Sequence, residues 1–327
     1  NYMGIIENIK KGVSNLGYKP TIVYAEGWNK TIQDAALQIK KEGVIEPILI
    51  FRTNSELSTF NNSLNVQTIV VESSDLSKYE NLLFELRKEK GLTLDEAKKL
   101  TKEPNYLASL IVKSNENYGA ICGIEYTTKD TLRAALQVIK AKKGSIVNSI
   151  MILEKPGKSI FASDIGLVID PSAEELAKIV HNSVDFIVNT LKIQNNNVAM
   201  LSFSTNGSGA GESVDKVKKA YEIYKTNFEQ NPHANVYGEI QFDAAVVESI
   251  RKKKSPNCTW TSDANVFIFP NLDAGNISYK ILQRYAGFEP TGPIIIGLDK
   301  PVNDLSRGAG LHEVVSLSYV TALQTKK

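Results

Sequence analysis

The sequence predicts an α/β protein built on mostly parallel β-sheets. Short apolar runs rich in β-branched residues alternate along the chain with longer amphipathic segments. Such alternation is typical of parallel strands connected by helices. The runs at 198–203, 265–269 and 294–296 are largely apolar, which is typical of strands buried on both faces. The sequence therefore predicts helices covering both sides of its sheets.

The first half of the chain carries clear start and stop signals. A helix is predicted over 31–41, because its apolar residues recur at helical spacing and Gly43 follows. Thr93 and Glu96 form a capping-box pattern that opens a further helix. We also expect strands at 21–24, 48–51, 68–71 and 119–122, and helices at 76–90 and 131–141.

The second half repeats this pattern. A strand is predicted at 149–153, and Ser172 with Glu175 caps a long helix that continues to Leu191. The apolar runs named above supply the remaining strands, and the apolar spacing after Gly310 predicts a last helix over 311–323.

Composition limits the classes of function. The 327 residues suffice for one large or two ordinary domains. The net charge of +2 gives no general attraction to nucleic acid or membranes. Two cysteines are too few for a disulfide scaffold, and neither a zinc-ligand spacing nor a bilayer-spanning apolar stretch is present in the sequence. With no signal-peptide pattern visible, we expect a cytoplasmic protein.

The most informative stretch is the run Lys300-Pro301-Val302-Asn303-Asp304-Leu305-Ser306-Arg307-Gly308, which follows a strand and precedes the last helix. A helix N-terminus attracts anions, and Ser306 and Arg307 add a hydroxyl donor and a planar guanidinium suited to phosphate. Gly308 allows close approach of the backbone. The residues alone support two interpretations: an anion site, or a polar helix cap with a surface arginine.

A second loop, Asn206 to Ser213, resembles a nucleotide-binding P-loop only superficially. The P-loop needs a glycine where Asn206 lies and a lysine where Glu212 lies. A carboxylate at that position would repel a phosphate, so ATP binding is not expected.

Two other arginines are ambiguous. Arg87 lies near the end of its predicted helix, where solvated cations are common, and Arg133 lies near the start of its helix, where a cation is unfavourable without an anion partner. Cys122 follows an apolar strand and is predicted to be a buried structural residue rather than a nucleophile.

The nine residues Lys300–Gly308 match a signature of the phosphate acetyltransferase (phosphotransacetylase) family, which this chain resembles. Further ordered blocks match the family as well, at 131–137, 199–205, 238–245, 264–270 and 274–277. The resemblance implies a fold like that of isocitrate and isopropylmalate dehydrogenases. It divides the chain into a first α/β domain, 1–144 plus 298–327, and a second, 145–297, with the active site in the interdomain cleft.

The resemblance also implies a reaction. Acetyl phosphate and coenzyme A would give acetyl-CoA and phosphate, reversibly, by direct thiolate attack in a ternary complex, without a metal or a bound cofactor. A homodimer is the family expectation. The family places an aspartate seven residues after the signature serine, where this chain has Glu313. The implied catalytic residues are Ser306, Arg307 and Glu313, and the implied residues for binding coenzyme A and acetyl phosphate are Arg87, Thr128, Arg133, Asn303 and Gly308.

Other functions stay open at this point. A phosphate butyryl or propionyl transferase would share these motifs, because acyl-chain preference depends on pocket volume. A non-catalytic sensor of coenzyme A or acyl phosphate is compatible with the departure at Glu313. A dehydrogenase of the same fold would need a nicotinamide site and usually an aspartate cluster, neither of which we identify in the sequence.

Overall fold

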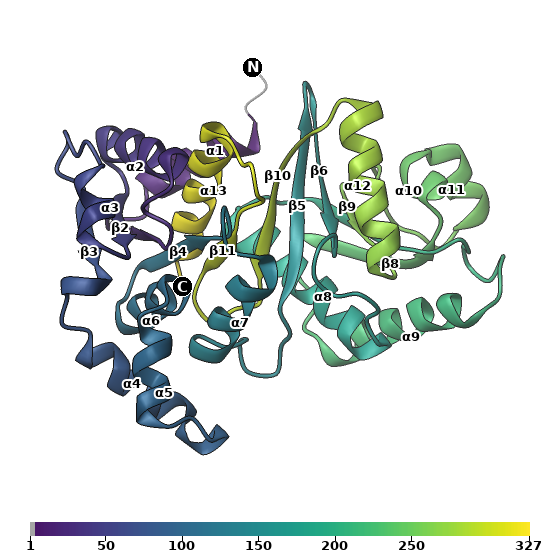
Figure 1. Cartoon of the computed structure of the whole chain (residues 1–327). Helices are drawn as coiled ribbons and strands as arrows, with labels where there is room; N and C mark the ends of the chain where they lie inside the picture. Colours follow the sequence, from purple (N-terminus) through teal and green to yellow (C-terminus); the bar gives the residue numbers. More distant parts are fainter. Residues whose placement is uncertain (1–3) are drawn as a thin grey trace. The chain divides into compact units, whose positions relative to one another are not determined.

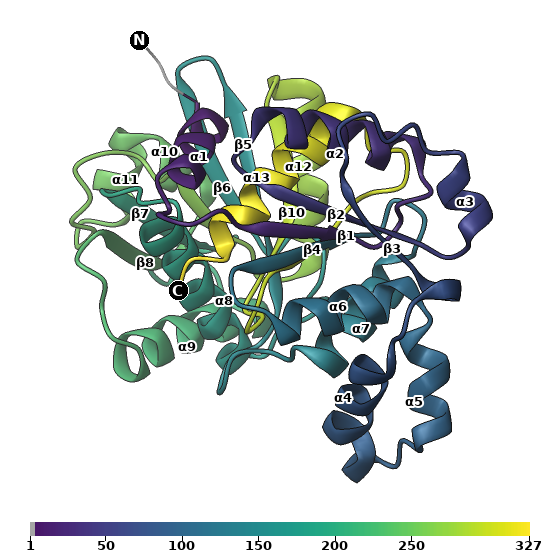
Figure 2. The ribbon, with the colours of Figure 1, turned by 90° about the vertical axis from the view of Figure 1, so that its left-hand side faces the viewer.

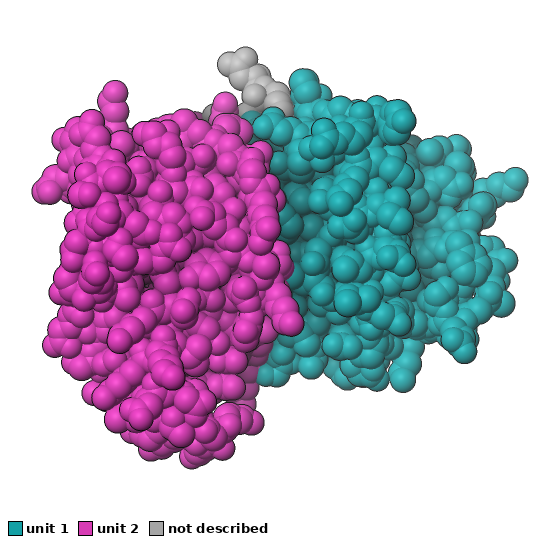
Figure 3. Space-filling view, viewed as in Figure 1, with its two compact units in different colours: residues 1–5, 144–297 teal, residues 6–143, 298–327 magenta. Residues whose placement is uncertain are grey.

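A computed structural model describes residues 4–327. The chain forms two compact α/β units (Figure 3), and each contains its own sheet. One unit consists of Gly144–Gly297 with a short N-terminal piece ending at Ile5, and is called unit 1. The other, unit 2, consists of Ile6–Lys143 and Leu298–Lys327. Within residues 4–327, no helix is long and apolar enough to cross a membrane.

Unit 2 contains an all-parallel sheet with the strand order β11-β4-β1-β2-β3. Helices α2 and α13 cover one face, and α6 and α7 cover the other, with α4 and α5 packed below α6 (Figure 2). The elements are β1 Thr21–Tyr24, α2 Lys30–Glu42, β2 Glu46–Phe51, α3 Asn54–Ser58, β3 Gln67–Val70, α4 Ser77–Arg87, α5 Leu94–Thr101, α6 Pro104–Ser114, β4 Tyr118–Cys122, α7 Thr128–Val138, β11 Val302–Asp304 and α13 Leu311–Gln324; α1, Ile5–Ser14, leads into this unit.

Unit 1 contains a six-stranded sheet with the order β10-β5-β6-β9-β7-β8. Helices α8 and α9 cover one face, and α10 and α12 lie on the other (Figure 1). The elements are β5 Asn148–Lys155, β6 Lys158–Ser163, α8 Ala173–Asp185, a π-helical turn Phe186–Thr190, β7 Asn196–Leu201, α9 Glu212–Asn227, β8 Ala234–Ile240, α10 Phe242–Val246, α11 Glu248–Lys254, β9 Val266–Ile268, α12 Leu272–Ala286 and β10 Glu289–Ile296.

The α/β class and the mostly parallel pairing are confirmed. The exceptions lie in unit 1, where β5 pairs antiparallel with both β10 and β6. The apolar runs are buried where they form strands: every residue of β7 and β9 is buried, and these strands lie inside the sheet. The prediction was wrong for Phe203 at the end of the run 198–203, because β7 ends at Leu201 and Phe203 is 60% exposed. The aromatic side chains of Trp260 and Phe267 help fill the core of unit 1.

Several helix boundaries follow the predicted signals. Gly43 ends α2 in the left-handed conformation that favours glycine, with a φ of 80°. The capping boxes at Thr93 and Ser172 are both formed. The helix predicted over 76–90 is shorter, because α4 ends at Arg87 and a 3-10 turn follows it.

Candidate active site

The signature loop joins β11 to α13 at the carboxyl edge of the sheet in unit 2. Edges of this kind are the usual ligand sites of open α/β sheets. The Leu305 N–H donates to the Cys122 carbonyl at 2.8 Å, which continues the pairing of β11 with β4. Ser306, Arg307 and Gly308 then lie exposed to solvent. Gly308 has a φ of 80°, and this conformation explains why a glycine is needed there.

The N-terminus of α13 follows this loop directly. Gly310 is its N-cap residue, and no side chain of residues 4–327 caps the helix there. The first N–H groups of a helix lack intrahelical partners and favour anions. Glu313 lies exposed in the first turn. The loop and helix thus present a hydroxyl, a guanidinium and backbone N–H groups within a few residues, as an anion site requires.

The start of α7 lies beside the same loop. Thr127 caps α7 by accepting from the Asp130 N–H at 3.0 Å. The Thr128 hydroxyl donates to Asp304 Oδ2 at 2.7 Å, so a predicted substrate-binding residue is joined to the end of β11. Arg133, one turn further along α7, forms an exposed ion pair with Asp130. Two helix N-termini therefore meet at the carboxyl ends of β4 and β11.

A buried carboxylate organises the loop between β4 and α7. Glu26 follows β1 and is 1% exposed. It accepts hydrogen bonds from the N–H groups of Gly123, Glu125 and Tyr126 at 2.6–2.8 Å. Burial raises the pKa of Glu26, and these backbone donors oppose that effect. The carboxylate fixes the path of the chain into α7, and so fixes the position of Thr128.

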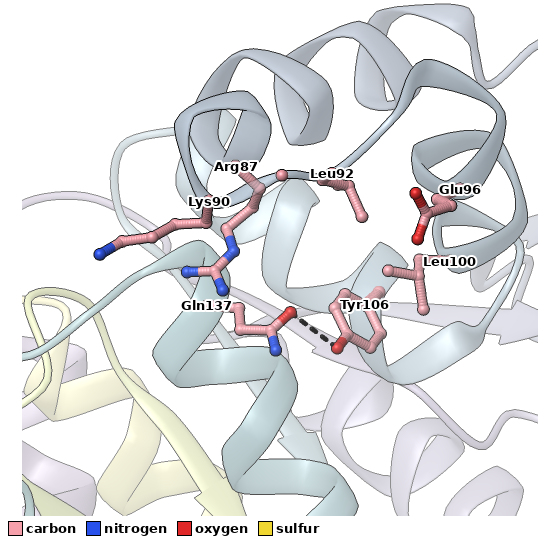
Figure 4. A pocket seen from close by; sticks show the side chains of 8 residues that line it. Arg87, Lys90, Leu92, Glu96, Leu100, Tyr106 and Gln137 are labelled. Atoms are coloured by element: carbon pink, nitrogen blue, oxygen red, sulfur yellow. Dashed lines mark hydrogen bonds between the residues drawn. The ribbon is translucent and has the colours of Figure 1, made fainter.

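Arg87 lines a separate pocket of about 220 Å³ on unit 2. Figure 4 shows its guanidinium reaching from the end of α4 toward Gln137 of α7, whose amide oxygen accepts from the Tyr106 hydroxyl at 2.9 Å. The pocket combines cationic, amide and apolar groups with one carboxylate, that of Glu96. Its lining consists of Arg87, Lys90, Gly91, Leu92, Glu96, Leu100, Tyr106 and Gln137.

The signature also contains residues that the fold itself engages. Asn303 is buried in β11, and its amide donates to the Thr321 hydroxyl and to Gln324. The Lys300 ammonium donates to the carbonyls of Val112, Lys113 and Asn115 at the end of α6. A role for Asn303 in substrate binding stays a prediction, since its amide is bonded within the unit.

Sequence reasoning did not single out the carboxylates of Asp304 and Glu26. Asp304 is the last residue of the parallel strand β11, and Glu26 lies two residues after the parallel strand β1. Polar residues at the carboxyl ends of parallel strands are a recognisable sign of a functional edge. Gly123 was missed as well. A Cβ atom there would lie 2.1 Å from Asp304 Oδ1, so only glycine fits between β4 and α7.

The glycine-rich loop of unit 1 precedes α9, as the sequence indicated. Gly211 is the N-cap and Glu212 begins the helix. Within the loop, the Gly207 N–H donates to Glu239 Oε1 at 3.2 Å, and Glu239 is 4% exposed. The loop is thus held by a carboxylate of its own unit. The carboxylate of Glu212 also opposes the binding of a nucleotide phosphate here, whereas Glu239 is paired with the Lys218 ammonium at 3.7 Å.

The fold and this site define a class of protein: a two-unit α/β protein with an exposed Ser-Arg-Gly loop and a helix N-terminus at the carboxyl edge of a parallel sheet. The family model described as "Phosphate acetyl/butaryl transferase" matches residues 4–322. The chain belongs to this family, which confirms the resemblance inferred from its motifs.

Individual relatives agree over nearly the whole chain. The phosphate acetyltransferase of Mycoplasma pneumoniae is 44% identical over 327 residues, covering 99% of this chain and 100% of the relative. The solved structure of a phosphotransacetylase from Streptococcus pyogenes has a TM-score of 0.90 at 36% identity, covering 98% of each chain. The EutD phosphotransacetylase from Staphylococcus aureus has the same TM-score and coverage at 33% identity.

Proposed function

We propose that this protein is a phosphate acetyltransferase, which transfers an acetyl group reversibly between acetyl phosphate and the thiol of coenzyme A. The observation that carries the proposal is the intact Ser306-Arg307-Gly308 loop at the uncapped N-terminus of α13. The start of α7 lies beside it, joined by the Thr128–Asp304 hydrogen bond. Family membership over residues 4–322 supports the same assignment.

Charge stabilisation is the main task of such a site. The thiolate attacks the acetyl carbonyl, the new carbon–sulfur bond forms, and phosphate leaves with the electrons of the broken carbon–oxygen bond. We propose that Arg307 and Arg133 balance the phosphate charge, and that Ser306 with nearby N–H groups holds the carbonyl oxyanion. One such donor is worth about 3–4 kcal/mol in the transition state. Gly308 lets the backbone approach the substrate.

The nucleophile needs a proton acceptor. We propose Glu313 for this role, because it lies in the first turn of α13, a few residues from Ser306. A free thiol ionises near pH 8.5, so neighbouring guanidinium groups would also have to stabilise the thiolate. No metal or bound cofactor enters this scheme, and coenzyme A is a substrate.

The pocket at Arg87 fits a part of coenzyme A that does not react. Arg87 and Lys90 offer positive charge for a phosphate group, while Leu92, Leu100 and the Tyr106 ring offer apolar surface. We propose that this pocket contributes to coenzyme A binding. Arg87→Gln should then raise the KM for coenzyme A more than it lowers kcat.

We also propose a cytoplasmic homodimer that binds no nucleic acid. The net charge of +2 and two free cysteines support a cytoplasmic setting without nucleic acid.

The proposal of a homodimer rests on an exposed apolar stripe along α12. It consists of Ile277, Ile281 and Tyr285, with Tyr285 92% exposed. Apolar surface of this kind supports association of two copies. Light scattering should report a dimer, and Ile281→Lys should shift it toward the monomer.

The decisive experiment measures coenzyme A-dependent thioester formation and phosphate release from acetyl, propionyl and butyryl phosphate, with EDTA present. We expect acetyl-CoA formation with acetyl phosphate. Faster reaction with the longer substrates would instead assign a propionyl or butyryl transferase. If no short acyl phosphate gave a thioester while coenzyme A still bound, the protein would be a sensor.

A further inference from the structure

Asp304 connects the two loops of the candidate site. It is the last residue of β11 and lies in register with Cys122 of β4. Its Oδ2 atom accepts from the hydroxyl of Thr128, the first residue of α7, at 2.7 Å. Ser306 follows two residues later in the chain. One carboxylate thus joins the start of α7 to the strand that carries the signature loop.

The surroundings of this carboxylate offer few hydrogen-bond partners other than Thr128. Asp304 Oδ1 is buried and has no hydrogen-bond partner among residues 4–327. It packs against Gly123, where a Cβ atom would approach to 2.1 Å. The nearby Thr131 hydroxyl donates to Cys122 Sγ at 3.3 Å, and it also lies close enough to Asp304 to lower the pKa of that carboxyl. Thr128 therefore supplies the short hydrogen bond that orients Oδ2 of Asp304.

The charged and titratable neighbours do not compensate the charge of Asp304. From the turn after β1 it faces the carboxylate of Glu26, and from β4 it faces the thiol of Cys122. From α7 it faces only the hydroxyls of Thr128 and Thr131, because Arg133 pairs with Asp130. Burial raises the pKa of Asp304 to about 6, the hydroxyls of Thr128 and Thr131 lower it, and repulsion by Glu26 raises it. A buried carboxylate whose charge is not compensated destabilises the fold. We therefore expect Asp304 to have a role in the candidate site.

We propose that Asp304 is a positioning residue of the transfer reaction: its ionised carboxylate holds Thr128, and so keeps the first turn of α7 in register with the Ser306–Gly308 loop. The inference rests on the proposed function, because it concerns the same site. When Asp304 takes up a proton, its hydrogen bond from Thr128 weakens, since a charged acceptor binds a donor more strongly than a neutral one. Transfer activity should therefore fall on the acid side as Asp304 protonates.

The test measures kcat and KM for both substrates between pH 5 and pH 9 in the unsubstituted enzyme and three variants. The unsubstituted enzyme should lose kcat on the acid side with a midpoint near pH 6. Thr128→Val should move this midpoint up by about one pH unit, the value of one hydrogen bond to a charged acceptor. Thr128→Ser should restore it. Asp304→Asn should abolish the acid loss and lower kcat at pH 8 by roughly ten-fold.

A matched control separates positioning from general weakening of the helix. Thr127→Val removes the N-cap of α7 at the neighbouring residue without touching Asp304. It should lower thermal stability but leave the acid midpoint in place. An acid midpoint that is identical in the unsubstituted enzyme, Thr128→Val and Thr127→Val would overturn the inference while leaving the proposed function intact. If the unsubstituted enzyme made no acetyl-CoA, the proposed function would fail first, and this inference with it.

Discussion

The Asn303 amide donates to the Thr321 hydroxyl at 2.8 Å, which ties β11 to the last turns of α13. The next residue, Asp304, points to the opposite face of the sheet, because side chains alternate along a strand. There it accepts from Thr128 of α7. Two adjacent residues of one short strand thus fix the helices on both sides of the signature loop. Part of the signature therefore holds the fold together, and we propose that the exposed Ser306 and Arg307 carry out its chemistry.

The first prediction concerns Arg307. Arg307→Gln should lower turnover by about 100-fold or more, on the order of one lost transition-state contact. Arg307→Lys should not restore turnover, because a lysine lacks the planar fork of donors. Initial rates of acetyl-CoA formation at saturating substrates measure both effects. Arg284→Gln, which removes an exposed guanidinium from α12 in unit 1, is the matched control. Normal turnover of Arg307→Gln would leave Arg307 as a surface residue of the helix cap.

The second prediction is that acetyl transfer proceeds without an acyl-cysteine intermediate. Cys122 is buried in β4 as the sequence predicted, and burial raises the pKa of its thiol, so it is a poor nucleophile. The double variant Cys122→Ala, Cys258→Ala should retain acetyl transfer, with a loss of about 1 kcal/mol in stability from the cavity at β4. Initial-rate plots should intersect. Parallel plots, together with loss of transfer on removing either cysteine, would establish covalent catalysis instead.

Local signals account for the elements that the sequence predicted correctly. The Ser172 capping box works through residues three positions apart, and α8 begins where that pattern lies. Strand β11, which lies inside the signature run, was not predicted. Strands β6 and β8 were not predicted either. The antiparallel β5–β6 hairpin turns at residues 156–157, and β8 mixes exposed, partly buried and buried residues without regular alternation. Neither has the continuous apolar pattern that identified β7 and β9.

In the candidate site too, local sequence patterns identified some residues, whereas others depend on contacts between distant parts of the chain. Ser306, Arg307 and Gly308 were found from their order along the chain. The bonds from Glu26 to the β4–α7 loop span 97 to 100 residues of sequence, so no local pattern indicates them. The inward orientation of Asp304 likewise depends on Gly123, which lies far from it in sequence. A single sequence shows which polar residues follow a strand, but not which of them face one another.

The third prediction concerns Glu313, where the chain departs from the family aspartate. Glu313→Gln keeps the size of the side chain but removes the proton acceptor, so the rate should fall strongly near pH 7. The deficit should shrink toward about pH 8.5, where a free thiol ionises unaided. Glu313→Asp should retain far more activity, because it keeps the charge. The comparison is the pH–rate profile of the three enzymes. An equal loss at every pH, or none, would rule out the general-base role.

The fourth prediction concerns the stability cost of Asp304. Its pKa is about 6 in the native state against an ordinary value of 3.8. Because the native pKa is raised, the free energy of unfolding is not reduced by Asp304 below about pH 4, where its carboxyl is protonated in both states. That stability is lost as pH rises through 6 and the buried carboxyl ionises. The cost is at most about 3 kcal/mol, at about 1.4 kcal/mol for each pKa unit. Asp304→Asn lacks this charge but keeps an oxygen that accepts from Thr128. In urea unfolding followed by circular dichroism, it should match the unsubstituted protein near pH 4 and exceed its stability by pH 7, even though its turnover is lower. Asp34→Asn, a partly exposed control in α2, should show no such pH-dependent gain. Parallel stability curves for Asp304→Asn and the unsubstituted protein would mean that Asp304 carries no stored electrostatic cost.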